Sequence, residues 1–217
     1  MRQFKVILAA IAVAGLASAA EASTVFNTSL SDPPGVFFGT GNFNDGYAVT
    51  TQGGLEIGLK SKIRGDATDS IVPVGDLYSI GLGNKVNFDY AVIPGSIDLT
   101  GATQTLTILN VGTHQTFSFD PSLVGDNTKS GSAYENSEQL AFYPVGFSTS
   151  TNATYDVFLT ISGVKGLDGP VSVEDVIKVG AGGVPEPASW GLMILGLGGV
   201  GATLRRNRKS APVAATA

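Results

Sequence analysis

The side chains that most often carry out catalysis are scarce in this sequence. It has no cysteine and one histidine, His114, among 217 residues. Cysteine nucleophiles, disulfides and cysteine metal sites are therefore excluded, and one histidine does not make a zinc site. A serine–histidine–acid triad would need His114, which lies in the turn-like stretch 112–115, where an exposed polar residue is expected. We predict that the protein is not an enzyme.

Acidic side chains in two short glycine-containing stretches offer oxygen ligands for a hard cation. Asp66 and Asp69 lie in the first stretch and Asp126 lies in the second. Calcium binds carboxylate and carbonyl oxygens on loops, so these three residues are the candidates for a calcium site. Neither stretch has the fixed ligand spacing of a calcium-binding loop, and the pattern favours ordinary solvated turns. No other cofactor is expected.

The most informative pattern lies near the C-terminus. A Gly-rich linker at 180–184 leads to Pro185, Glu186 and Pro187, and Trp190 follows two residues later. The prolines keep this stretch extended and accessible to an enzyme, and tryptophan suits the membrane interface. After an apolar run to residue 204 comes a basic cluster, which is expected to stop transfer and stay cytoplasmic. Its members are Arg205, Arg206, Arg208 and Lys209.

The apolar run 190–204 predicts a short transmembrane helix that anchors the chain only temporarily. It has 15 residues, of which five are glycine. Such a helix would be about 22 Å long against a hydrocarbon core of about 30 Å. The protein is therefore expected to contact the inner membrane transiently through this run.

This order of elements resembles the PEP-CTERM sorting signal in its PEPxxW variant. The matching positions are Pro185, Glu186, Pro187 and Trp190, followed by the apolar run and the basic cluster, so that the signal occupies 185–209. The resemblance implies a substrate of exosortase, a membrane protease expected to cut at the Pro-Glu-Pro motif. Bearers of the signal typically come from Gram-negative bacteria that make exopolysaccharide. The tail 210–217 extends beyond the usual end of such signals and is expected to be disordered.

The N-terminus predicts a secretory signal peptide over residues 1–22. A short basic stretch at 1–5 precedes an apolar run at 6–19, and Ala20 and Ala22 are the small residues that signal peptidase requires at −3 and −1. Cleavage is expected after Ala22, with 17–19 as a second possible site. Between residues 23 and 184 there are 16 acidic and 7 basic residues, a net charge of −9. That charge argues against nucleic-acid binding.

The body at 23–179 is predicted to be an all-β, two-sheet sandwich, jelly-roll-like in connectivity. Apolar residues alternate with polar ones at 55–60, 86–92 and 155–161, which is typical of strands with one buried face. Further strands are expected at 37–43, 47–51, 77–82, 104–111, 113–119, 139–147 and 171–179, with a hairpin turn at 111–114. Residues 120–138 are polar and poorly patterned, and we expect a long loop there.

These features lead to one main functional hypothesis and two alternatives. The main hypothesis is a non-catalytic cell-surface or extracellular-matrix protein, processed by exosortase and associated with exopolysaccharide or biofilm. The first alternative is a lectin-like carbohydrate-binding module that binds sugar with or without calcium, and an exposed aromatic strip is its discriminating feature. Its candidates are Tyr47, Tyr78, Tyr134 and Tyr143. The second is a polysaccharide hydrolase using paired carboxylates.

Overall fold

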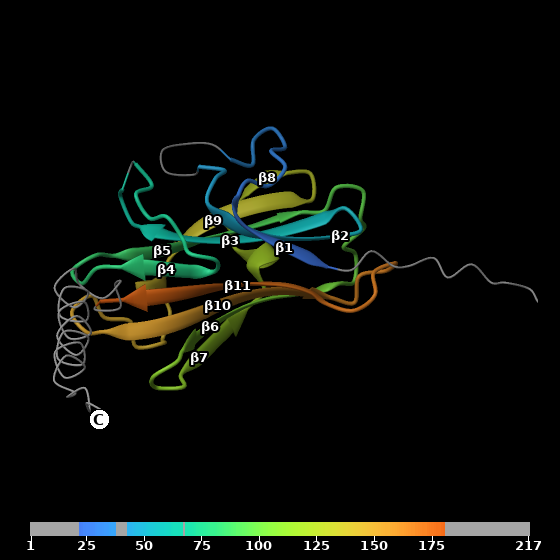
Figure 1. Cartoon of the computed structure of the whole chain (residues 1–217). Helices are drawn as coiled ribbons and strands as arrows, with labels where there is room; N and C mark the ends of the chain where they lie inside the picture. The colour runs from blue at the N-terminus through green and yellow to red at the C-terminus, as the bar shows by residue number, and fades with distance from the viewer. Residues whose placement is uncertain (1–21, 38–42, 67, 181–217) are drawn as a thin grey trace, which may run out of the picture.

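The computed structural model describes residues 22–37, 43–66 and 68–180, and these residues form two β-sheets packed face to face (Figure 1). The six-stranded sheet has the order β1-β2-β3-β5-β9-β8, and the five-stranded sheet has the order β4-β11-β10-β6-β7. The strands of the first sheet are β1 (Ser23–Thr28), β2 (Tyr47–Gln52), β3 (Leu55–Ile63), β5 (Val86–Ile93), β8 (Thr128–Ser130) and β9 (Ala133–Gln139). Those of the second are β4 (Leu77–Ile80), β6 (Thr103–Asn110), β7 (Thr116–Phe119), β10 (Ala153–Ser162) and β11 (Val171–Val179).

The hydrophobic core lies between the two sheets. Alternate residues of β3, β5, β6, β10 and β11 point into it, among them Leu59, Phe88, Ile108 and Leu159, all fully buried. Burial of apolar surface of this kind is the main favourable term in folding. The prediction of an all-β, two-sheet body is confirmed.

Strand connectivity differs from the jelly-roll prediction. A jelly roll is built from two Greek keys, in which strands return over long connections to lie beside earlier ones. Here most neighbouring strands also follow one another in the chain, as in β1-β2-β3, β6-β7, β8-β9 and β10-β11. Among the described strands, β4 and β11 form the parallel pair, and the other pairs are antiparallel. The jelly-roll prediction was therefore wrong.

Two further local predictions were wrong. The expected loop at 120–138 contains β8 and β9, and β9 is a buried interior strand although its sequence, AYENSEQ, is polar. The expected strand at 139–147 is instead the 3-10 helix η2 (Leu140–Phe142) followed by turns, since Pro144 lacks the N–H that a strand ladder needs. A second 3-10 helix, η1, spans Pro121–Leu123. The strand expected at 37–43 falls mostly outside the described residues, and Phe37 and Phe43 at its ends are not in a strand.

A chain segment between β1 and β2 covers the outer face of the six-stranded sheet, and we call its described residues, 29–37 and 43–46, the covering segment. In Figure 1 it lies in blue on the side of that sheet away from the five-stranded sheet. Leu30 and Val36 are buried against the sheet in a small second core. Asn44 closes the segment by donating to the Leu30 carbonyl at 2.8 Å and accepting from the Leu30 N–H at 2.9 Å.

The predicted targeting segments lie outside the described residues. These include most of the signal peptide, the transmembrane run 190–204 and the tail 210–217. Across the described part of the chain, no helix has the length and apolar character needed to cross a membrane.

Candidate functional site

Four charged side chains are buried together on the covered face of the six-stranded sheet. Lys60 and Lys62 come from β3, Asp89 from β5 and Glu135 from β9, and we call these four residues the charge cluster. They share a face because strand side chains alternate: Lys60 pairs with Asp89, and Asp89 with Ser137, two residues from Glu135. All four are at most 6% exposed, which is unusual for charged residues.

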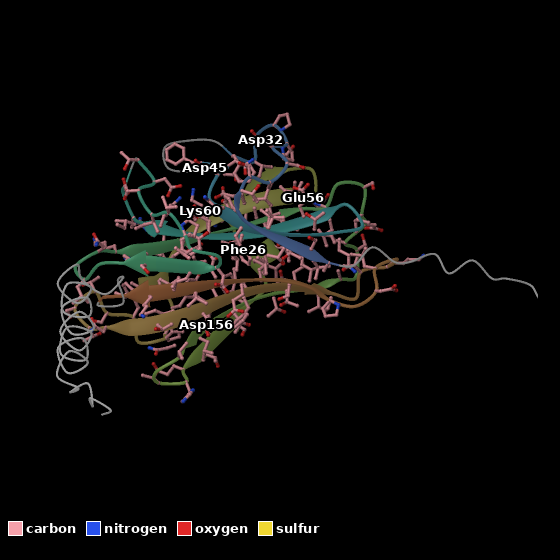
Figure 2. The ribbon with its side chains drawn as sticks, viewed as in Figure 1. Phe26, Asp32, Asp45, Glu56, Lys60 and Asp156 are labelled. Carbon is pink, nitrogen blue, oxygen red and sulfur yellow. The ribbon has the colours of Figure 1, made fainter. Side chains whose placement is uncertain are left out.

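Ion pairs hold the lysines of the charge cluster in place. Lys62 Nζ lies 2.5 Å from Asp89 Oδ2. Lys60 forms ion pairs with Asp69 and with Asp45, the latter at 3.2 Å, and donates to the Phe43 carbonyl at 3.4 Å. Figure 2 shows Lys60 and Asp45 together on the covered side of the sheet. Lys60 therefore ties the strand to the covering segment, whereas Lys62 pairs within the sheet.

Burial shifts the protonation of the acidic groups. Desolvation, reinforced by the negative charge of Asp89, raises the pKa of Glu135 to about 8, against the opposing hydrogen bond from Thr128 Oγ1 at 3.2 Å. Desolvation also raises the pKa of Asp89, although the charge of Lys62 acts to lower it. On the opposite face, burial raises the pKa of Asp175, which accepts a hydrogen bond from Ser61 Oγ at 3.1 Å. Burial disfavours the ionised form of a carboxyl in each case.

Close backbone packing seals the charge cluster from solvent. Gly58 lies on the same face of β3 as Lys60, and a methyl group there would lie 2.8 Å from Leu30 Cδ1 and 3.0 Å from Tyr47 Cδ1. Only glycine lets the covering segment approach this closely. The covering segment is also anchored by Glu56, which accepts from the Ser31 N–H at 2.7 Å and the Ser31 hydroxyl at 2.8 Å (Figure 2).

Two hollows on the surface of the described residues lie away from the charge cluster. One shallow hollow lies beside β1 and β11 and includes Phe26 and Glu174. Another is lined by residues from the loop before β6, from β6 itself and from the β8–β9 hairpin, including Asp98, Gln104 and Lys129. Neither is lined by a member of the charge cluster.

The residues predicted to bind calcium have other partners. Asp66 accepts from the N–H and hydroxyl groups of both Thr68 and Ser70, and these hydrogen bonds lower its pKa. Asp69 pairs with Lys60, and Asp126 accepts from Asn136 Nδ2 at 2.9 Å. No group of three or more metal-ligating side chains was found in the described residues. The calcium site stays a prediction.

Other predicted features are placed clearly. His114 is exposed beside the turn that joins β6 and β7, with φ of 58°. Tyr47, Tyr78 and Tyr134 are at most 4% exposed, and Tyr143 is half-buried and stacks on Phe119 at 5.3 Å between ring centroids. The four tyrosines therefore do not form an exposed aromatic strip.

The residues of the two processing signals are not part of the described geometry. Ala22 is exposed immediately before β1. The remainder lie outside the described residues: Ala20, Pro185, Glu186, Pro187, Trp190, Arg205, Arg206, Arg208 and Lys209.

Sequence reasoning missed the charge cluster. The usable signal was the placement of Lys60 at the end of the predicted strand 55–60, with Lys62 two residues beyond it, and of Asp89 in the predicted strand 86–92. Charges of opposite sign can pair across neighbouring strands. Nothing in that pattern says that the face is buried. The apolar residues of the covering segment, Leu30, Val36 and Phe37, supply that information only once the segment is known to fold back.

Comparison with known proteins addresses the C-terminal segment. A family model described as the PEP-CTERM protein-sorting motif matches residues 183–209, which confirms the resemblance inferred from Pro185, Glu186, Pro187 and Trp190. Among curated proteins, no sequence matches the chain. The matched residues make up a small part of the chain, so the match concerns sorting and says nothing about the β-sandwich. The chain thus carries a PEP-CTERM protein-sorting motif, which implies export and exosortase-dependent sorting to the cell surface.

Proposed function

We propose that this protein is a non-catalytic structural component of the cell surface or extracellular matrix, associated with exopolysaccharide. The single observation that carries the proposal is the sorting motif at 183–209, since it implies that the body is delivered outside the cell. Signal peptidase would remove residues 1–22 first, and exosortase would act afterwards at Pro185, Glu186 and Pro187. The mature protein would then be the β-sandwich without its C-terminal sorting signal.

The chemistry of the described body supports a structural role. Three acidic groups whose pKa is raised by burial, Glu135, Asp89 and Asp175, lie inside the fold. A catalytic acid or base must come within hydrogen-bond reach of its substrate, and these groups are enclosed by protein. The body also has a net charge of −9, which favours solubility and repulsion between copies over nonspecific adhesion to anionic polymers.

Deletion of the exosortase gene in the producing strain tests the sorting route. Surface labelling should detect the protein on wild-type cells, whereas the deletion strain should retain a longer, membrane-associated form. A variant with Glu186→Ala in the motif should behave like the deletion, and Glu174→Ala in the sandwich is the matched control that should be sorted normally. Unchanged surface placement and size in the deletion strain would refute the route.

A lectin-like function is the second candidate, and the polar hollow beside Asp98, Gln104 and Lys129 favours it. Charged and amide side chains of this kind bind sugar hydroxyls by hydrogen bonding. Tyr134 donates to Gln104 Oε1 at 2.6 Å at the edge of the hollow and so holds that amide in place. Calorimetry with the producing strain's own exopolysaccharide, with and without calcium, would detect saturable binding. Absence of heat in both titrations would remove this candidate.

A further inference from the structure

The pairing of Lys62 with Asp89 differs from an ordinary surface ion pair in three respects. Both side chains are buried, at 7% and 0% exposure, and both belong to interior strands of one sheet. Their charged groups are in contact, with Lys62 Nζ 2.5 Å from Asp89 Oδ2. A third ionisable group, Glu135, lies on the same face one diagonal position from Asp89. Burial of two opposite charges is costly when they are simply ion-paired.

From this geometry we propose that Lys62 and Asp89 become joined by an intramolecular isopeptide bond between Nζ of Lys62 and Cγ of Asp89. Asp89 Cγ is bonded directly to Oδ2, so the lysine nitrogen already lies near the attack distance of about 3–3.5 Å. The two groups are also held by adjacent hydrogen-bonded strands, which prevents them from separating. The reaction would therefore proceed within the folded protein without any external enzyme.

The reaction balances as a dehydration. A proton passes from the Lys62 ammonium to the Asp89 carboxylate, which gives a neutral amine and a neutral acid without moving net charge out of the cluster. The nitrogen lone pair attacks Cγ, and a tetrahedral intermediate forms. The C–N bond remains when the C–O bond to the hydroxyl breaks, and one water molecule leaves. No oxidant, cofactor or second substrate is needed.

Glu135 is placed to carry the proton that must move in this step. The nitrogen loses a proton while the departing hydroxyl gains one, and a neutral carboxyl can donate through one oxygen and accept through the other. Burial and the charge of Asp89 raise the pKa of Glu135 to about 8, so it is protonated at neutral pH. In the register of β5 and β9, Glu135 lies on the same face as Asp89, one diagonal position away. It is regenerated at the end of the reaction.

The neighbouring lysine lacks this combination. Lys60 also contacts two carboxyl groups, but the side chain of Asp45 is 68% exposed, and Asp69, although its side chain is only 12% exposed, lies on a loop rather than on a strand that would hold it against Lys60. Water at an exposed carboxylate stabilises the ionised form, which does not react with an amine. Lys60 therefore serves as the internal control for the reaction at Lys62.

The bond would act as a cysteine-free cross-link for an exported protein. It would join β3 to β5 and close residues 63–88 into a covalent loop, and a cross-link of this type restricts the unfolded chain in the same way as a disulfide. The sequence has no cysteine with which to form a disulfide. Extracellular proteins commonly use covalent cross-links for stability.

Peptide mapping of the mature protein purified from its producing strain tests the proposal. Trypsin cleaves after lysine and arginine but not after an acylated lysine. The denatured, digested protein should therefore yield residues 61–64 joined to residues 86–129, at the summed mass less one water, about 18 Da. Recovery of residues 86–129 only as an unmodified linear peptide, with cleavage after Lys62, would overturn the proposal. The joined peptide is required because a succinimide at Asp45 or Asp168, each followed by glycine, also loses one water.

Variants separate the chemistry from the fold. Lys62→Arg keeps the positive charge and should abolish the joined peptide, while Lys60→Arg on the same face should leave it unchanged. Glu135→Gln should slow formation of the bond by about 100-fold or more, measured by peptide mapping at timed intervals after the first folding of chains recovered unfolded from inclusion bodies, in which the bond has not yet formed. Formation of the joined peptide at the wild-type rate in Glu135→Gln would overturn the role of Glu135, and loss of the peptide in Lys60→Arg would overturn the specificity for Lys62.

Discussion

The outer faces of the two sheets have the same alternating sequence pattern but different environments. On the six-stranded sheet, the outward residues of β3 and β5 include Lys60, Lys62 and Asp89, and the covering segment buries them. On the five-stranded sheet, the outward residues of β10 and β11 include Thr160 and Ser172, whose hydroxyls lie 2.8 Å apart in an exposed pair. Figure 2 shows Asp156 on this open side, opposite Lys60. Period-two alternation therefore identifies the two faces of a strand but does not identify which face is covered.

The difference has an energetic consequence. A charge on the open face keeps its contact with water, so its removal changes little. A charge on the covered face depends on its protein partner, because a buried ion left without one is expensive. Matched substitutions on the two faces should therefore differ widely in their effect on stability.

The largest difference is expected between Asp89→Ala and Glu174→Ala. Asp89→Ala leaves Lys62 buried without its carboxylate and should lower the free energy of unfolding by about 3–5 kcal/mol. Glu174 is half-buried on the outer face of β11. Its replacement by alanine should lower the free energy of unfolding by less than about 1 kcal/mol. Urea denaturation of both variants measures the effects. Similar losses in the two variants would mean that the faces are equivalent.

The pH dependence of stability sharpens the comparison. Folded Glu135 holds its proton up to about pH 8, whereas the unfolded chain loses it near pH 4.5, so the folded state binds more protons between these values. The stabilisation that comes from keeping Glu135 protonated in the folded state is fully present below pH 4.5. The free energy of unfolding should therefore fall as pH rises to 8, by at most about 1.4 kcal/mol per pH unit. Glu135→Gln should flatten this slope in denaturation curves recorded across the range. A slope of the same size in Glu135→Gln would assign the effect to other groups.

A smaller effect is expected from Gly58→Val. The added side chain would meet Leu30 and Tyr47 at van der Waals overlap distances and should lower the free energy of unfolding by about 1–3 kcal/mol through overpacking. Thr160→Ala on the open face is the control and should change it by less than about 0.5 kcal/mol. Thermal denaturation followed by circular dichroism measures both. A Gly58→Val variant with the same free energy of unfolding as the wild type would show that the covering segment can shift to admit the larger side chain at little cost.

The sequence predicted the strands whose inner face is apolar and whose boundaries are marked by turns. β11 was predicted at its observed limits, and β3, β5 and β10 were placed within a few residues, because their alternation is regular. β9 was missed because Glu135 and Asn136 are polar and their burial depends on partners far away in the chain. The 3-10 helix at Leu140 was taken for a strand because local apolar content carries no information about the break that Pro144 imposes.

The presence of the sorting motif was predicted from sequence, whereas the charge cluster was not. A linear signal works through neighbouring residues, so Pro185, Glu186, Pro187 and Trp190 are recognisable without a fold. The charge cluster gathers Lys60, Asp89 and Glu135 from three strands and depends on the covering segment to exclude water. Such a site is specified by tertiary structure, and the spacing of its residues along the chain has no characteristic pattern.

Mass spectrometry of the C-terminal peptide from the mature cell-surface protein tests the central claim of exosortase sorting most directly. The account predicts a mature chain that ends at or before the Pro-Glu-Pro motif at 185–187, with no peptide from the apolar run or the basic cluster. A mature surface protein that continues to Ala217 would contradict it.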